Sequence, residues 1–196
     1  MTPGAGRPLR ADAQRNREKI LAAAVRVFTE EGLDAHFERI AREAGVGTGT
    51  LYRNFPTREA LIEAAYRNEV ARLCDAVPEL LAAMPPAQAL RVWTRRFIDY
   101  ATAKLGMAEA LRAVVASGGN PYADSHELIQ SALAALMDAA IAAGAIRSDI
   151  GATDMFAALA GIALTSAGPG QREQAERLLD LTLDGLKAGP RALPED

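Results

Sequence analysis

Six side chains that can form hydrogen bonds or carry positive charge lie within eleven consecutive positions: Thr48, Thr50, Tyr52, Arg53, Asn54 and Arg58. Threonine hydroxyls can donate to a phosphate or accept from a base edge, and their methyl groups can contact thymine. The amide of Asn54 can pair with adenine or bond to a phosphate. Gly47 and Gly49 lie among them, and glycine lets the backbone approach a partner closely. The chemistry of this cluster is therefore recognition by hydrogen bonding.

Catalytic and metal-dependent chemistry finds no support in the sequence. A single cysteine, Cys74, excludes an internal disulfide, and the two histidines, His36 and His126, are far apart. No nucleophile is paired with a base, no acidic motif has metal-ligand spacing, and no glycine-rich loop precedes a helix in the pattern that holds phosphate. We therefore expect neither an enzyme nor a metal or cofactor site.

The spacing of Ala41, Gly45 and Leu51 predicts how this cluster is held in place. Two helices that meet at a sharp angle need a small residue where they touch, and Ala41 supplies it. Gly45 tolerates the positive φ of a tight turn, and Leu51 anchors the next helix back onto the first. A buried helical hairpin has the same spacing. The preceding amphipathic helix and the polar outer face of the third helix favour a helix-turn-helix that reads DNA.

The rest of the chain predicts an all-α fold of about nine helices, because alanine is abundant and no segment alternates as a strand does. The first helix should run from Asp12 to Glu31, with Leu21, Ala24, Val25 and Phe28 on one apolar face and Gly32 at its end. Thr57 should cap a fourth helix. A break is expected at Pro78, and further helices are expected at 87–105, 107–116, 124–143, 152–167 and 171–187.

This pattern predicts four segments. Residues 1–10 form a flexible arm carrying Arg7 and Arg10, which is either an untidy terminus or a basic arm that touches DNA. A helix-turn-helix domain at 11–56 is followed by a helical regulatory and dimerisation domain at 57–189. Residues 190–196 form a tail.

Charge and hydropathy fit this division. Residues 1–58 carry ten Lys and Arg against seven Asp and Glu, whereas the remaining residues carry twelve against eighteen. A cationic head is suited to phosphate. The N-terminal residues have no apolar segment of a signal peptide, and the longest apolar run, which begins at Met155, is too short to span a bilayer. We expect a cytoplasmic protein with no membrane partner.

The segment IAREAGVGTGTLYRNFPTREALI closely resembles the signature of tetracycline-repressor (TetR) family regulators. The resemblance covers about the first 65 residues and implies that the third helix enters the major groove. It assigns DNA contacts to Gly47, Thr48, Gly49, Thr50, Tyr52, Arg53, Asn54 and Arg58, with Arg10 of the arm beside them. Tyr52 is either a packing aromatic or a phosphate ligand, and Arg53 is either a contact or a solvated charge.

Three positions depart from the family pattern. Arg58 stands where lysine is usual, which preserves the charge. Gly47 replaces a frequent serine and weakens helix capping, with Thr48 as a substitute. Phe37 replaces a threonine, so that a phosphate contact is exchanged for an apolar anchor.

The resemblance also implies a homodimer in which the last two helices form a four-helix bundle with those of the partner. The predicted dimer residues are Met155, Leu159, Ile162, Leu178, Leu179, Leu183 and Leu186. The last helix has more leucines than one face needs, so that either a partner subunit or a second contact within the chain must cover the rest.

A ligand pocket is predicted from an aromatic and methionine stripe, although such a stripe is also typical of plain core. The residues are Trp93, Phe97, Tyr100, Met107, Leu111, Val114, Leu133, Met137 and Phe156. Few charges lie among them, so the small-molecule effector would be largely apolar.

The sequence therefore predicts a homodimeric repressor that binds palindromic operator DNA and is released by a small ligand. An activator or a ligand-independent regulator would have the same sequence features. A helical enzyme has no supporting motif, and a protein-interaction module without DNA binding is disfavoured by the polar third helix.

Overall fold

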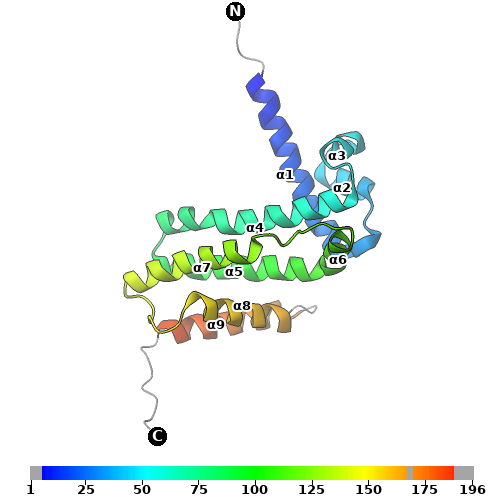
Figure 1. Ribbon diagram of the computed structural model, residues 1–196. Coiled ribbons are helices and arrows are strands. Elements are labelled where there is room, and N and C mark those ends of the chain that lie inside the picture. The colour runs from blue at the N-terminus through cyan, green and yellow to red at the C-terminus, as the bar shows by residue number, and fades with distance from the viewer. Residues whose placement is uncertain (1–5, 167–169, 188–196) are drawn as a thin grey trace, which may run out of the picture. The chain divides into compact units, whose positions relative to one another are not determined.

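The computed structural model describes residues 6–166 and 170–187, with side chains described from Asp12 onward. Within these residues the protein consists of nine α-helices and one short 3-10 helix, without strands (Figure 1). The prediction of an all-α fold is confirmed. The elements are α1 (Gly6–Glu31), η1 (Gly32–Asp34), α2 (Phe37–Ala44), α3 (Thr48–Asn54), α4 (Arg58–Ala83), α5 (Pro86–Gly106), α6 (Ala108–Ala116), α7 (Ser125–Ala142), α8 (Ala152–Thr165) and α9 (Arg172–Lys187).

The helices form two compact units. Of the described residues, the first unit contains those up to Asn68 together with Gly106–Pro121, and the second contains Glu69–Leu105 and those from Tyr122 onward. The first unit therefore includes α6, although α6 lies inside the predicted regulatory domain of residues 57–189. Within this unit α6 packs against η1. Leu111 and Val114 of α6, and Met107 just before it, are buried in this unit.

Helix α1 begins at Gly6, six residues before the predicted start at Asp12. Residues 6–10 are thus helical and not a flexible arm, which corrects that prediction. Pro8 lies in the first turn, where backbone N–H groups have no acceptor within the helix, so that it does not interrupt α1. Gly32 has a φ of 55° and ends the helix as predicted. The predicted apolar face of α1 is buried at Leu21, Ala24, Val25 and Phe28.

Helix α4 continues through Pro78, so the predicted break at this residue is wrong. Proline in a helix interior removes one hydrogen bond and costs about 3 kcal/mol or more. Burial of the neighbouring Ala76, Val77 and Leu80 offsets this cost. One turn before the proline, the carbonyl of Leu73 also accepts a hydrogen bond from the indole nitrogen of Trp93 at 2.8 Å.

In the second unit α8 packs against both α7 and α9. Trp93 is fully buried, and its ring stacks on that of Phe97 with centroids 5.9 Å apart. Phe97 in turn contacts Tyr100 at 5.9 Å and Phe156 at 5.8 Å. This aromatic cluster forms part of the core of the unit.

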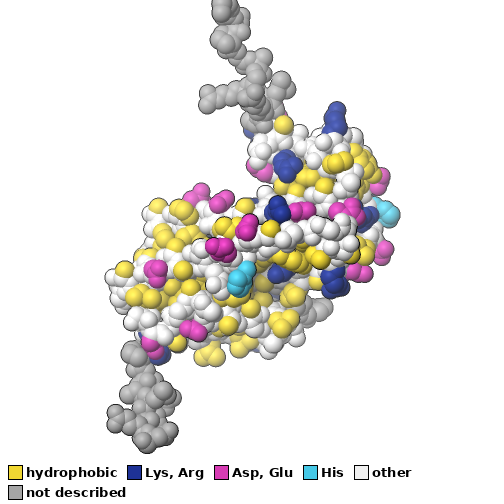
Figure 2. All heavy atoms as spheres, in the orientation of Figure 1, with side chains coloured by type: hydrophobic (Ala, Val, Ile, Leu, Met, Phe, Trp, Pro, Cys, Tyr) yellow, Lys and Arg dark blue, Asp and Glu magenta, His cyan; other side chains and the backbone are white. Residues whose placement is uncertain are grey.

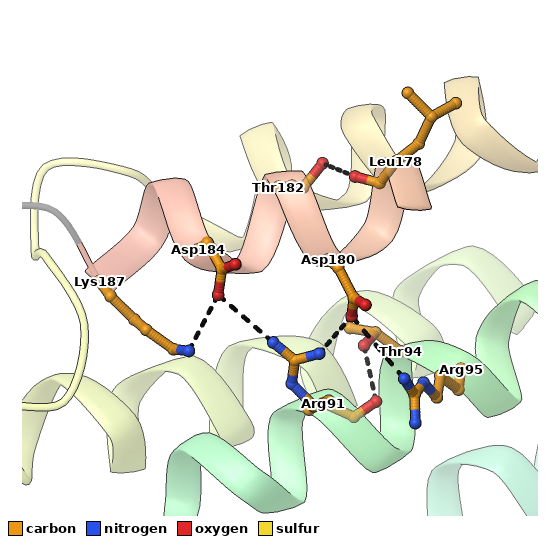
Figure 3. Close-up of polar contacts among 8 residues, drawn as sticks. All are labelled: Arg91, Thr94, Arg95, Leu178, Asp180, Thr182, Asp184 and Lys187. Atoms are coloured by element: carbon orange, nitrogen blue, oxygen red, sulfur yellow. Dashed lines mark hydrogen bonds and ion pairs between the residues drawn. The ribbon is translucent and has the colours of Figure 1, made fainter. Parts of the chain in front are cut away.

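Ion pairs fix the register of α9 on α5 (Figure 3). Arg91 pairs with Asp180 and Asp184, and Arg95 lies 3.7 Å from Asp180. Lys187 donates to Asp184 at 2.9 Å, and together with Arg91 it lowers the pKa of that carboxyl below its ordinary value. Asp180 and Asp184 point toward α5, whereas Leu178 and Thr182 point away from it.

In the described part of the chain, no helix combines the length and the apolar character that crossing a membrane requires.

Candidate nucleic-acid interface

The turn between α2 and α3 has the geometry that the sequence predicted. Gly45 adopts a left-handed conformation with φ 66° and ψ 34°. The N–H of Gly45 donates to the carbonyl of Arg42 at 3.2 Å, and that of Val46 donates to Ala41 at 3.0 Å. This pair of bonds is the Schellman motif of helix C-termini. Ala41 and Leu51 are 2% and 0% exposed, so both predicted anchors of the helix-turn-helix are buried.

Gly47 precedes helix α3 at the N-cap position and has no side chain with which to cap it. The weakened capping predicted for this position is therefore present, and the N–H of Thr50 bonds to the Gly47 carbonyl at 2.8 Å instead. Gly49 is exposed, and no heavy atom would lie within 4 Å of a Cβ built on it. The start of α3 thus presents open backbone, with Thr48 half-buried beside it.

The outer face of α3 is polar, and its side chains are ordered by contacts within the helix. Arg53 is exposed and donates to the hydroxyl of Thr50 at 3.1 Å, while the amide of Asn54 donates to the Thr50 carbonyl at 2.8 Å. Tyr52 is 47% exposed, and its ring lies 5.0 Å from that of the buried Phe37. The ring of Tyr52 therefore packs while much of its surface faces solvent.

Two arginines remain among the predicted DNA contacts, Arg58 and Arg10. The guanidinium of Arg58 donates to the carbonyl of Leu33 at 2.7 Å. Arg58 therefore joins the start of α4 to η1. The predicted cap is confirmed one residue earlier, where Thr57 accepts from the N–H of Ala60 at 3.1 Å. The side chain of Arg10 lies outside the described residues.

Four cations of this unit pair with carboxylates among the described residues. Arg26 pairs with Glu43, and Arg39 pairs with both Glu30 and Glu31. These pairs bind α2 to α1.

Sequence reasoning missed two exposed cations, Lys19 on α1 and Arg42 on α2. Neither makes an ion pair within the described residues. Helical spacing alone could have found Arg42, because it lies off the apolar stripe formed by Phe37, Ile40 and Ala44.

Comparison with known proteins assigns this arrangement to a family. The family model described as bacterial regulatory proteins, tetR family, matches residues 20–65. A second model, described as transcriptional regulator SbtR-like, C-terminal domain, matches residues 85–188, more than half of the chain. The chain belongs to the tetR family of bacterial regulatory proteins. It is a DNA-binding transcriptional regulator and not an enzyme.

Solved structures of TetR-family regulators are similar over most of the chain. A TetR transcriptional regulator from Streptomyces coelicolor is 85% identical, covers 87% of this chain and 98% of its own, and superposes with a TM-score of 0.86. A TetR transcription regulatory protein from Mycobacterium vanbaalenii is 36% identical, covers 92% and 100%, and has a TM-score of 0.76.

A curated relative is similar over a short part of the chain. An HTH-type transcriptional regulator of Staphylococcus aureus (strain USA300) is 44% identical over 54 residues, which is 27% of this chain. The match spans 29% of the length of that relative.

The residues predicted to line a pocket in this TetR-family regulator lie in both units. Trp93, Phe97, Leu133 and Met137 are at most 3% exposed and belong to the core of the second unit, and Phe156 is half-buried beside them. Met107, Leu111 and Val114 are buried in the first unit with α6. Tyr100 is 7% exposed and borders an open hollow described below.

The residues predicted to form the dimer are largely buried within the chain. Among the seven, only Leu178 is partly exposed; the other six are Met155, Leu159, Ile162, Leu179, Leu183 and Leu186. These six pack within the single chain, and their part in a dimer stays a prediction. The exposed large apolar residues of α8 and α9 are Leu164 and Leu181, at 69% and 70%. Figure 2 shows hydrophobic side chains at the surface in this region.

Proposed function

We propose that this TetR-family regulator is a homodimeric repressor that binds a near-palindromic operator and is released by a small molecule. The observation that carries the proposal is the two-sided character of α3. Leu51 is fully buried, while Gly49, Tyr52 and Arg53 face solvent. A short helix with a polar, open outer face next to a tight turn has the form of a recognition helix.

The start of α3 would lie deepest in the major groove. Thr48 and Thr50 offer hydroxyl and methyl groups to base edges, and the open space around Gly49 permits close backbone approach. Arg53 would exchange its bond to Thr50 for a phosphate or a base edge. Lys19 and Arg42, which lack carboxylate partners among the described residues, would add phosphate contacts.

The dimer would be formed by stripes of exposed apolar and small residues on α8 and α9. On α8 the stripe is Ala157, Gly161 and Leu164, and on α9 it is Leu178, Leu181 and Gly185. Both stripes follow helical spacing.

The two glycines support a close helix contact. A Cβ at Gly161 or Gly185 would meet nothing within 4 Å, so the chain's own packing does not require glycine there. Mid-helix glycine costs about 0.5–1 kcal/mol relative to alanine. Close approach of a partner helix accounts for that cost. The resulting dimer would place two helix-turn-helix domains about 34–36 Å apart, so that they read two half-sites.

Release by a ligand requires that the ligand favour one arrangement of the protein over another. Helix α4 is suited to this role because its residues are shared between both compact units. A ligand held by the second unit would act on the operator through this helix.

Selection of bound DNA from a random library by the purified full chain tests the proposal. An enriched inverted repeat is the expected result, and the Arg53→Ala, Thr50→Ala double variant should lose it. Absence of enrichment at low salt would contradict operator binding. Enrichment of a single half-site would contradict binding of the operator by a dimer. A transcription assay on the selected operator then distinguishes a repressor from an activator.

A further inference from the structure

A hollow of about 490 Å³ opens between α4 and α5 in the second unit. Its volume lies in the range of about 300–1,000 Å³ that is usual for small-molecule sites. Both helices contribute to it within one compact unit. The lining residues are Glu69, Arg72 and Leu73 from α4, and Arg96, Asp99 and Tyr100 from α5.

The charged rim of the hollow leaves one guanidinium available. Glu69 and Arg72 pair with each other at 3.2 Å, and Asp99 accepts from Arg172 of α9 at 2.7 Å. Arg96 is exposed and makes no ion pair within the described residues. A guanidinium presents parallel N–H donors that match a carboxylate in a bidentate arrangement.

The apolar part of the lining comes from Leu73 and Tyr100. Leu73 and Tyr100 are 4% and 7% exposed, so only a small part of each reaches the surface. The ring of Tyr100 rests against Phe97, and the carbonyl of Leu73 is held by the indole of Trp93. An apolar group placed over these two side chains would meet atoms that are already held, which lowers the cost of ordering them on binding.

We propose that this hollow binds a small organic monocarboxylate, with its carboxylate on Arg96 and its apolar body over Leu73 and Tyr100. Glu69 and Asp99 stand at the same rim, so a second negative charge on the ligand would face two carboxylates. The ligand of this hollow is therefore a monoanion with an apolar end. Binding itself is independent of the operator; only its effect on DNA affinity rests on the proposed function.

Isothermal titration calorimetry of the full chain at low salt tests the proposal with two probes, phenylacetate and octanoate. The neutral alcohols of the same shape, 2-phenylethanol and octanol, serve as matched ligands. We expect at least one carboxylate to bind, and its alcohol to bind about tenfold or more weakly, because it lacks the charge-assisted bonds. The Arg96→Gln variant should lose the same factor.

The matched protein control is Arg112→Gln in α6 of the other unit, since Arg112 is an exposed cation with no ion pair among the described residues. This variant should bind the carboxylate as the wild type does. Equal affinities of Arg96→Gln and wild type, equal affinities for acid and alcohol, or no binding of either acid up to about 10 mM would each overturn the proposal. Since no step uses DNA, failure here leaves the operator test unaffected, and the converse also holds.

Discussion

The N–H of Val46 donates to the carbonyl of Ala41 at 3.0 Å, and this bond closes the turn that sets the angle between α2 and α3. The bond forms because Gly45, between them, adopts φ 66°, where residues with a Cβ are strained. The position of the whole polar face of α3 therefore depends on one residue without a side chain.

Replacing Gly45 tests this dependence. A Cβ at Gly45 would meet no atom within 4 Å, so the effect of Gly45→Ala is backbone strain alone, and we expect a loss of about 1–2 kcal/mol in the free energy of unfolding. Gly47 is the matched control, because it also has open space but an ordinary φ of −70°. Gly47→Ala should change stability by less than about 0.5 kcal/mol in urea unfolding. Equal effects of the two substitutions would contradict the argument.

Local signals in the sequence were sufficient to predict the helix-turn-helix. Gly32 and Gly45 mark turns by their conformational freedom, and Thr57 caps α4 through its own hydroxyl. Each of these features depends on residues within a few positions of one another, so that spacing alone reveals it.

Features that depend on distant contacts were not predictable. Helix α4 passes through Pro78 because the packing of its buried neighbours outweighs the lost hydrogen bond. This packing cannot be inferred from the residues next to Pro78 in the sequence. Helix α9 has leucines on several sides, and ion pairs with α5, among them those of Arg91 with Asp180 and Asp184, show which side faces α5. For the same reason Leu183 was assigned to the dimer although it is buried, and Leu181, which is exposed, was not.

Gly106 at the end of α5 leaves no room for a side chain. A Cβ there would lie 2.4 Å from Cγ2 and 3.3 Å from Cα of Thr29 on α1. We expect Gly106→Ala to destabilise the protein by about 1–3 kcal/mol through overpacking. Gly49→Ala, where a Cβ would meet nothing within 4 Å, should instead be neutral or stabilising in the same urea titration. A double-mutant cycle with Thr29→Ala should recover part of the loss, and no recovery would rule out this clash as its cause.

The role of Arg53 can be read from the salt dependence of operator binding. If its guanidinium neutralises one phosphate in each head, Arg53→Gln lowers the slope of log K against log salt by about 0.9 per head. Arg112→Gln removes the same charge from α6 and should leave the slope unchanged. Fluorescence anisotropy on the selected operator measures both slopes. If the two variants behave alike, Arg53 is a solvated charge and its bond to Thr50 has no part in binding.

Cys74 should be unreactive in the folded protein. Burial, followed by the nearby charge of Asp75, raises the pKa of the thiol from its ordinary value of 9.0 to about 11. At about pH 8 the folded chain should therefore react with iodoacetamide about a hundredfold more slowly than the chain in urea. Because the unfolded thiol ionises first, this group lowers stability as pH rises through 9 toward 11. Equal rates in the two states would contradict the shift, and Cys74→Ser provides the unlabelled control.

Leu164 and Leu181 test the proposed dimer without disturbing the core. Their side chains are 69% and 70% exposed, so Leu164→Asp or Leu181→Asp places a charge in solvent in the single chain. In a dimer built on α8 and α9 the same charge is buried against a partner, where an unpaired carboxylate costs several kcal/mol. We expect both variants to be monomers by light scattering after size exclusion, with helical content unchanged. Leu128→Asp on α7, at 49% exposure, is the matched control and should remain dimeric. A dimer that survives both substitutions would place the interface on another surface, and a wild type that is already monomeric would contradict the dimer itself.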